Sequence, residues 1–263
     1  ATSGDVVITF RALKGHRPQA LALMAEVAVQ PVFDAEELEK LRRRELDRLE
    51  LSQQDPRFLS TRAYYRALYG AHPYGRVDTT PDAVRAVTQA NLIAWHRTHV
   101  VANNAYLVVV GDVTAADVSR RAGRAFSRFR QGTVPEVSYP APPTRTEREI
   151  IIVDREGSQQ TSIRVGNLAI ARQHDDWVPL QVANQVLGGS ASSRLFMDLR
   201  ERRSLTYGAY SYVEERQQVG SFTVGAAVRT EVTAQAMEAL FEHLVAISSE
   251  APGNEETDLA RRF

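Results

Sequence analysis

A proline-rich segment in the middle of the chain divides it into two halves and limits what it can fold into. Residues 132–148, GTVPEVSYPAPPTRTER, contain four prolines and almost no large aliphatic side chains. Proline lacks a backbone N–H donor and fixes φ, so this stretch can be neither a helix nor a central strand. We therefore expect a linker at residues 134–148 between a first unit, residues 1–133, and a second unit, residues 149–263.

The first half combines strand-like and helix-like patterns. The apolar runs at residues 5–13 and 103–113 predict strands, and the second run is continuous enough to suggest burial on both faces. Helical spacing and end signals predict helices within residues 18–27, 31–56, 57–70, 80–100 and 114–129. Gly70 is expected to end the third helix, and Thr114 to cap the last.

The second half is predicted to hold four strands and three helices. The strands are expected within residues 148–155, 159–170, 204–215 and 218–229, and the helices within 175–187, 190–203 and 230–247. The last strand alternates Phe222, Val224, Ala226 and Val228, which predicts one buried face. Strands that come in pairs, with helices grouped between them, indicate an α+β fold with antiparallel sheets rather than regular βαβ winding.

Composition excludes several classes of function. The 32 basic and 32 acidic side chains balance, which argues against a general nucleic-acid binder and against docking on an anionic membrane. The sequence has no cysteine, so disulfides, thiol catalysis and cysteine metal ligands are excluded. No apolar run is long enough to predict a membrane span.

Familiar catalytic motifs are missing from the sequence. His96 and His99 are the only histidines close enough to share a helical face, but no acidic residue lies between them and no H-x-x-E-H is present. Two ordinary histidines on a half-exposed helix explain this pair better than a metal site. The segment GGSASS, residues 188–193, matches neither a phosphate loop nor a serine-nucleophile motif. It is better explained as a helix stop followed by helix-capping serines.

An arginine and a tyrosine form the remaining candidate site. Arg200 and Tyr207 lie seven residues apart across the junction between a predicted helix and a predicted strand. Both side chains donate hydrogen bonds, so together they could hold a peptide carbonyl or stabilise the oxyanion formed when it is attacked. A solvated arginine and a strand tyrosine packed on the core explain the same spacing, and surface arginine is the common case.

Three segments of the sequence resemble one family of enzymes. NQVLGGSASSRLFMDLRERRSLTYGAYS, residues 184–211, resembles the signature of the second half of pitrilysin/insulinase-type zinc peptidases, particularly the smaller bacterial and mitochondrial-processing members. Residues 72–113 and 31–49 follow the pattern of the same family. The resemblance runs from about Pro31 to the C-terminus with the segments in the family's order.

The resemblance implies a fold, a site and a partner. It implies two similar α+β units, each an antiparallel sheet with helices packed on one face, as in the processing peptidases. Four such units would enclose a chamber for an unfolded peptide. One side of the chamber carries zinc, and the other contributes an arginine and a tyrosine that match Arg200 and Tyr207. We expect the first unit to lack its N-terminal part, with the zinc-binding helix, and the second unit to be cut at its end.

The third zinc ligand of the family is absent at the aligned position. It should lie on a helix with two glutamates seven residues apart, where this sequence has Leu41 and Arg48. Leucine offers no ligand atom and a positive guanidinium repels Zn²⁺. The resemblance therefore implies no metal and no catalytic residue in this chain, with zinc expected in the catalytic partner.

These observations lead to one hypothesis and two alternatives. The chain is expected to be a non-catalytic subunit or domain that pairs with a zinc-bearing subunit of the same family, with a homodimer possible in isolation. It is alternatively a complete zinc peptidase whose H-x-x-E-H lies upstream, or a purely structural subunit. The arginine-rich, lysine-poor composition suggests a bacterial source, in the periplasm or cytoplasm, with the periplasm favoured.

Overall fold

The computed structural model describes residues 6–262, which group into two compact units. The first unit comprises residues up to 50 together with residues 78–139. The second comprises residues 51–77 and the chain from residue 140 onward. The chain thus passes between the units three times, and the last passage falls within the predicted linker. Residues 134–148 form neither helix nor strand, as their prolines require.

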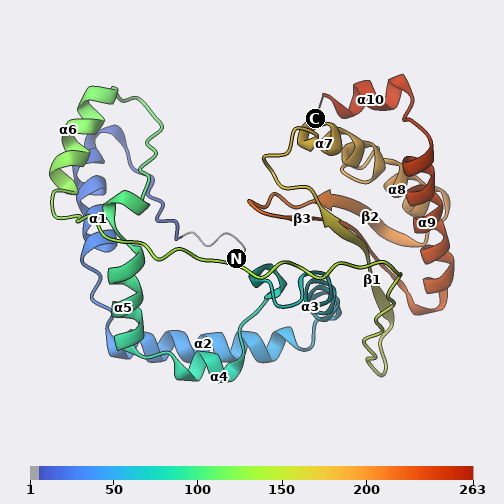
Figure 1. The fold of residues 1–263 in the computed structure, drawn as a ribbon, viewed down its shortest axis with the longest axis horizontal. Coiled ribbons are helices and arrows are strands. Elements are labelled where there is room, and N and C mark those ends of the chain that lie inside the picture. Colours follow the sequence, from blue (N-terminus) through green and yellow to red (C-terminus); the bar gives the residue numbers. More distant parts are fainter. Residues whose placement is uncertain (1–5, 263) are drawn as a thin grey trace. The chain divides into compact units, whose positions relative to one another are not determined.

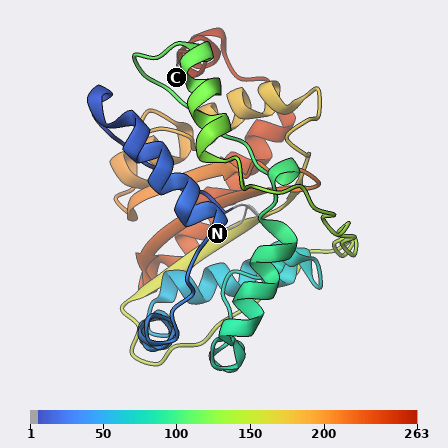
Figure 2. The ribbon, with the colours of Figure 1, turned by 90° about the vertical axis from the view of Figure 1, so that its left-hand side faces the viewer.

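Helices make up the regular structure of the first unit. They are η1 (Lys14–His16), α1 (Arg17–Val29), α2 (Ala35–Ser52), α4 (Pro81–Ala86), α5 (Gln89–His99), η3 (Ala102–Asn104) and α6 (Ala115–Ala125). α1 and α6 lie side by side in both ribbon views (Figures 1 and 2). The Arg17 guanidinium at the start of α1 donates to the backbone oxygen of Asp112, just before α6, and lies 3.9 Å from the Asp117 carboxylate.

Capping residues explain where these helices begin. The Asp34 carboxylate accepts from the first N–H groups of α2, and the Thr114 hydroxyl accepts from Asp117 in α6, which confirms the predicted cap at Thr114. The single helix expected over residues 80–100 is instead two helices, α4 and α5. Thr88 and Asn91 form a reciprocal capping box that starts a new helix, and Val87 has an extended backbone.

Two predicted strands, at residues 103–113 and 148–155, are not formed. Tyr106, Val108 and Val110 are 98%, 81% and 93% exposed, and Ile150 and Ile152 are each 85% exposed. A strand needs a hydrogen-bonded neighbour, and neither segment has one among the described residues. The expectation of burial on both faces of residues 106–110 was therefore wrong. Residues 6–13 of the first predicted strand are likewise not in a strand, and its first residue lies outside the described part of the chain.

The second unit contains an antiparallel sheet of three strands. These are β1 (Gln160–Ala169), β2 (Thr206–Val213) and β3 (Gly220–Arg229), in the order β1-β3-β2. Its helices are α3 (Pro56–Tyr69), η2 (Pro73–Gly75), α7 (Trp177–Leu187), α8 (Arg194–Phe196), the π-helical turn η4 (Met197–Arg202), η5 (Thr230–Val232), α9 (Thr233–Ser249) and α10 (Asn254–Ala260). The α+β class with an antiparallel sheet is thus confirmed.

One face of this sheet carries the main core. The predicted alternation in β3 places Val224, Ala226 and Val228 in it, all at most 8% exposed. The helices α7 and α9 cover this face, with Leu187 and Leu240 buried against it (Figure 1). Each such leucine contributes about 1.5–3 kcal/mol by leaving water. This packing fixes β2 and the turn before it, which carry the predicted site.

The opposite face is partly covered by α3. The Tyr64 hydroxyl donates to the Phe222 carbonyl over 2.9 Å, and the Tyr65 hydroxyl donates to the Glu214 carboxylate over 2.6 Å. Burial raises the pKa of Tyr64 to about 12, so this phenol stays protonated as a donor at neutral pH. α3 therefore belongs to the second unit although it precedes the proline-rich segment. No helix of the described residues is long and apolar enough to cross a membrane.

Candidate functional site

The candidate site lies at the turn that joins α8 to β2. Here α8 runs directly into η4, in which the Arg203 N–H bonds to the Asp198 carbonyl five residues earlier. Leu195 and Leu199 are fully buried beneath this turn and anchor it to the core. Ser204 then adopts a left-handed backbone, with φ of 52°, which reverses the chain into β2. Wide π-helical turns are frequent at functional sites, because they alter which side chains project outward.

Arg200 projects from the wide turn onto an aromatic ring. Its guanidinium carbon lies 4.8 Å from the centre of the Phe196 ring, a cation–π arrangement. The side chain is 45% exposed, and its Nε lies 3.3 Å from the Glu201 carboxylate. An ion pair between exposed groups contributes little, so the ring gives Arg200 its more specific support. The guanidinium is thus held on the Phe196 ring while remaining partly exposed at the surface.

Tyr207 is presented by an irregularity at the start of β2. The pairing of β2 with β3 shifts register between Thr206 and Ala209, which is a β-bulge. The Thr206 hydroxyl holds the bulge by donating to the Ala227 carbonyl over 2.7 Å and accepting from the Gly208 N–H over 3.2 Å. The Tyr207 side chain is 88% exposed. Its phenol is therefore available to a ligand and contributes little to the core.

A second tyrosine, which sequence reasoning did not assign, completes the cluster. The Tyr210 ring lies 5.5 Å from the Phe196 ring, on which Arg200 also rests. It folds over Gly208 so closely that a Cβ at that position would lie 2.6 Å from the Tyr210 ring. The structure thus joins Arg200 to Tyr210 through Phe196, which was not foreseen. The four-residue spacing of Phe196 and Arg200 within one helix was the available signal.

A cluster of polar and charged side chains around the buried Asp198 supports the same turn. Asp198 is 7% exposed and accepts from His243 Nε2 over 2.9 Å and from Arg203 over 3.0 Å. Burial raises the pKa of Asp198, but the hydrogen bonds from His243 and Arg203 outweigh it and leave the pKa below its ordinary value. Arg203 also bonds to Glu242 over 2.6 Å, which ties the turn to α9. These groups hold the backbone of Arg200 in place.

The glycine- and serine-rich loop has a structural explanation. Gly188 and Gly189 both donate to the Asn184 carbonyl and end α7, as predicted. The Gly188 carbonyl accepts from the Ser211 N–H over 2.9 Å, so the loop covers the free edge of β2. The serines do not cap α8 with their side chains, contrary to expectation, since the Ser193 hydroxyl donates to the Ser190 carbonyl instead.

The positions aligned with a family zinc ligand hold no such ligand here. Leu41 is 49% exposed on α2, and the Arg48 guanidinium binds the Glu45 carboxylate with two hydrogen bonds. His96 bonds to the Ala28 carbonyl, and His99 stacks on Trp95 with 4.9 Å between ring centres. No group of three metal-ligating side chains occurs among residues 6–262. His96 and His99 are thus engaged in ordinary helix packing.

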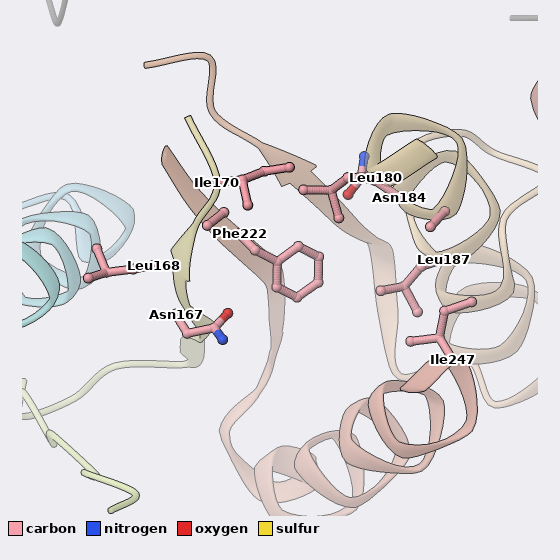
Figure 3. A pocket seen from close by; sticks show the side chains of 10 residues that line it. Asn167, Leu168, Ile170, Leu180, Asn184, Leu187, Phe222 and Ile247 are labelled. Carbon is pink, nitrogen blue, oxygen red and sulfur yellow. The ribbon is translucent and has the colours of Figure 1, made fainter. Parts of the chain in front are cut away.

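An apolar cavity of about 540 Å³ lies elsewhere in the second unit, between β1, β3, α7 and α9. Figure 3 shows Leu180 and Leu187 on one side of it, with Phe222 and Ile247 nearby. Its polar side chains are Asn167 and Asn184, and none of its lining residues is charged. It lacks groups for acid–base or nucleophilic chemistry, so Arg200 and Tyr207 remain the best candidates for function.

Comparisons with known proteins point to one family. A family model described as the peptidase M16 inactive domain matches residues 86–263. An uncharacterized zinc protease of Mycobacterium leprae is 27% identical over 252 residues, which are 92% of this chain and 55% of that protein. The chain thus spans about half the length of this curated relative. These matches confirm the resemblance drawn from the sequence.

Solved structures agree with this assignment. A peptidase M16 inactive domain from Pseudomonas fluorescens aligns with a TM-score of 0.85 and 28% identity, over 95% of this chain and 60% of that one. A protease from Helicobacter pylori also reaches a TM-score of 0.85, at 20% identity, over 95% of this chain and 61% of that one. The second match shows the fold alone.

Proposed function

Because this chain belongs to the peptidase M16 inactive-domain family, we propose that it is a non-catalytic domain that holds peptide substrate for a zinc-bearing partner of the same family. The observation that supports this proposal most is the presentation of two hydrogen-bond donors at one turn. Arg200 rests on Phe196 with its guanidinium at the surface, and a bulge presents Tyr207 to solvent. Neither side chain is used to stabilise the core.

The chemistry of the two groups suits peptide backbone. A guanidinium is charged at every relevant pH and offers up to five donors, while a phenol offers one. Directed at one carbonyl oxygen, they would stabilise negative charge that develops there during attack. The Asp198 cluster and the Thr206 hydroxyl fix the backbone on both sides of the turn, so the backbone needs little ordering when substrate arrives.

Zinc itself does not fit the aligned positions of this chain. Leu41 has no ligand atom, and the Arg48 guanidinium occupies the Glu45 carboxylate. These two positions therefore offer no zinc ligand. Hydrolysis is assigned to the partner, and this chain closes the other side of the substrate chamber and orients the unfolded peptide.

A cleavage assay tests the proposal. The full-length protein is mixed with its catalytic partner, and kcat/KM for a fluorogenic peptide is measured for Arg200→Ala and Tyr207→Phe. Loss of a charged hydrogen bond in the transition state is expected to lower kcat/KM by about 10- to 100-fold for Arg200→Ala. Arg202→Ala, an exposed arginine in the same turn, and Tyr106→Phe, a fully exposed tyrosine, are the matched controls. Unchanged kcat/KM in both test variants would show that the assigned roles are wrong.

A second candidate function is favoured by the names of the relatives. The curated relative from Mycobacterium leprae is named a zinc protease, and this chain covers only 55% of it. The full-length protein would then be a zinc peptidase that carries its metal site outside these residues. In that case Arg200 and Tyr207 would serve a zinc site of their own polypeptide. The two candidates differ in whether the purified full-length protein retains zinc without a partner.

A further inference from the structure

The sheet of the second unit carries an uncompensated arginine on the face opposite the main core. The register places Arg164 of β1, Gly225 of β3 and Tyr210 of β2 in one row across the three strands. Residues directly opposite each other in antiparallel strands point to the same face. The neighbouring row, Ile163, Ala226 and Ala209, lies in the main core, so the row of Arg164 points away from it.

Arg164 is held in place but not neutralised. Its Nη1 donates to the Tyr212 hydroxyl over 2.7 Å. Its Nε is buried and has no hydrogen-bond partner among the described residues, and no carboxylate of those residues pairs with its guanidinium. Other arginines of this unit differ in this respect, since Arg203 pairs with Glu242 and Arg229 with Glu231. The terminal Nη groups of a half-buried, unneutralised guanidinium suit the two oxygens of a planar anion.

Gly225 lies between Arg164 and Tyr210 in this row and adds no side chain to it. A Cβ at this position would lie 3.8 Å from the Ile163 carbonyl oxygen and 4.0 Å from Arg164 Nη1, which are ordinary contact distances. Packing therefore does not require glycine here, and its backbone has no positive φ. Without a side chain, Gly225 forms a strip of bare backbone, the floor, between the Arg164 guanidinium and Tyr210.

α3 contacts the sheet next to the Arg164 row. The Tyr64 hydroxyl bonds to the Phe222 carbonyl and to the Thr223 hydroxyl in the next row. A Cβ on Gly166 in that row would lie 2.4 Å from the same hydroxyl, so α3 covers the sheet there. Two residues before Arg164 on β1, the Ser162 hydroxyl lies 2.9 Å from the Ser60 hydroxyl of α3. α3 therefore contacts the sheet on both sides of Arg164, and Arg164 Nη1 reaches across to the Tyr212 hydroxyl of β2.

We propose that Arg164, positioned by Tyr212 beside Gly225 and Tyr210, binds the carboxylate of an acidic side chain in an extended peptide. The proposal rests on the proposed peptide-binding function and adds to it a preference for glutamate or aspartate. A side-chain carboxylate suits the site better than a C-terminal one, because the peptide can then continue across Tyr210 toward the Phe196–Arg200 stack. The two Nη groups and the phenols supply the donors for the two carboxylate oxygens.

Binding of matched peptides tests this assignment. Fluorescence anisotropy is measured with two labelled ten-residue peptides, amidated at the C-terminus, that differ only by Glu or Gln at one central position. The wild-type chain is expected to bind the Glu peptide about tenfold more tightly than the Gln peptide at low salt. Arg164→Gln is expected to abolish this ratio, and Tyr212→Phe to reduce it. Arg229→Gln, which removes an arginine already paired with Glu231, is expected to leave it unchanged.

A second variant keeps the proposal testable if Arg164→Gln does not fold. Gly225→Val adds a β-branched side chain where a Cβ fits, so it should fold normally, yet it should weaken binding of both peptides by filling the floor. An unchanged Glu/Gln ratio in Arg164→Gln would overturn the proposal, as would equal binding of the two peptides by the wild type. A preference that appears only with a free C-terminal carboxylate would assign the site to peptide ends and also refute it.

The outcome separates this inference from the proposed function. Arg200→Ala is expected to weaken binding of both peptides without altering the Glu/Gln ratio. If Arg200→Ala and Tyr207→Phe change nothing while Arg164→Gln removes the ratio, the roles of the turn fail and the carboxylate site stands. The opposite pattern refutes the carboxylate site alone.

Discussion

Gly188 is predicted to tolerate no side chain, because its carbonyl and its Cα both approach β2. A Cβ at this position would lie 2.3 Å from the Ser211 backbone N, 2.6 Å from the Ser211 Oγ and 2.9 Å from a methyl group of Leu195. Ser211 and Leu195 are buried, and the backbone nitrogen cannot move unless β2 moves. The φ of Gly188 is −157°, so the close approach, and not an unusual backbone conformation, excludes a side chain.

The cost of Gly188→Ala follows from two losses. Overpacking a buried site costs about 1–3 kcal/mol. Separating the Ser211 N–H from the Gly188 carbonyl removes one hydrogen bond, which contributes about 1 kcal/mol. We therefore expect the variant to lower the free energy of unfolding by about 3 kcal/mol in total. Gly225→Ala, on the same sheet but with ordinary contact distances, is expected to change it by less than about 0.5 kcal/mol.

Urea unfolding followed by tryptophan fluorescence measures this cost. Trp177 lies in α7, is 3% exposed and reports on the second unit, while Trp95 lies in the first. Trp95→Phe is used as the background for every variant, so that only unfolding of the second unit is recorded. Equal midpoints for Gly188→Ala and Gly225→Ala would refute the argument that Gly188 seals the edge of β2.

Three further predictions concern the supports of the site and the first unit. Asp198→Asn should destabilise the second unit at neutral pH, because the folded-state pKa of Asp198 lies below its ordinary value of 3.8. The stabilisation is therefore full above pH 3.8 and is lost as the pH falls through the lower folded value. Urea midpoints measured from pH 6 downward should thus converge for wild type and variant, and a constant gap would contradict the assignment. Phe196→Leu should lower kcat/KM with partner and peptide by about three- to tenfold, because it removes the ring beneath Arg200. Phe196→Tyr should restore it, and equal loss in both variants would indicate a packing defect instead. Gly123→Ala, inside α6 with nothing within 4 Å of the added Cβ, should stabilise the first unit by about 0.5–1 kcal/mol in thermal unfolding, and a lower Tm would show that α6 is not a regular helix there.

Local patterns in the sequence predicted several helix ends and the buried face of one strand. The alternation of Phe222 to Val228 predicted which face of β3 is buried, and the structure confirms it. The cap at Thr114 and the stop at Gly188 were also readable, because each depends on residues within one turn of the helix. Short-range periodicity is therefore sufficient to predict a feature when the residues that form the pattern also make the contacts.

Features that depend on distant residues were not readable. The close approach of Gly188 to Ser211 joins two segments 23 positions apart, and no local pattern signals it. The strands expected at residues 103–113 and 148–155 are not formed for a related reason. An apolar run predicts a strand, but it does not show whether a distant segment is available to pair with it.

The site was predicted in part. Arg200 and Tyr207 were singled out by their donor groups and spacing and were favoured by the resemblance, and their roles in binding stay a prediction. The four-residue spacing of Phe196 and Arg200 was a local signal for their contact, but the contact of Phe196 with Tyr210 could not be inferred, because the bulge at Tyr207–Gly208 decides where Tyr210 points. Arg164 was not singled out from the sequence. The sequence shows neither the row of the sheet in which it lies nor that its Nε has no hydrogen-bond partner among the described residues.

Zinc content of the purified full-length protein tests the central claim most directly. The protein is expressed without its partner, dialysed against a chelator and then against trace zinc, and its bound metal is measured by mass spectrometry. A non-catalytic domain predicts no stoichiometric zinc in the isolated protein, and one zinc per complex after the partner is added. One tightly held zinc per isolated chain, accompanied by peptide cleavage, would contradict the account and establish the complete peptidase instead.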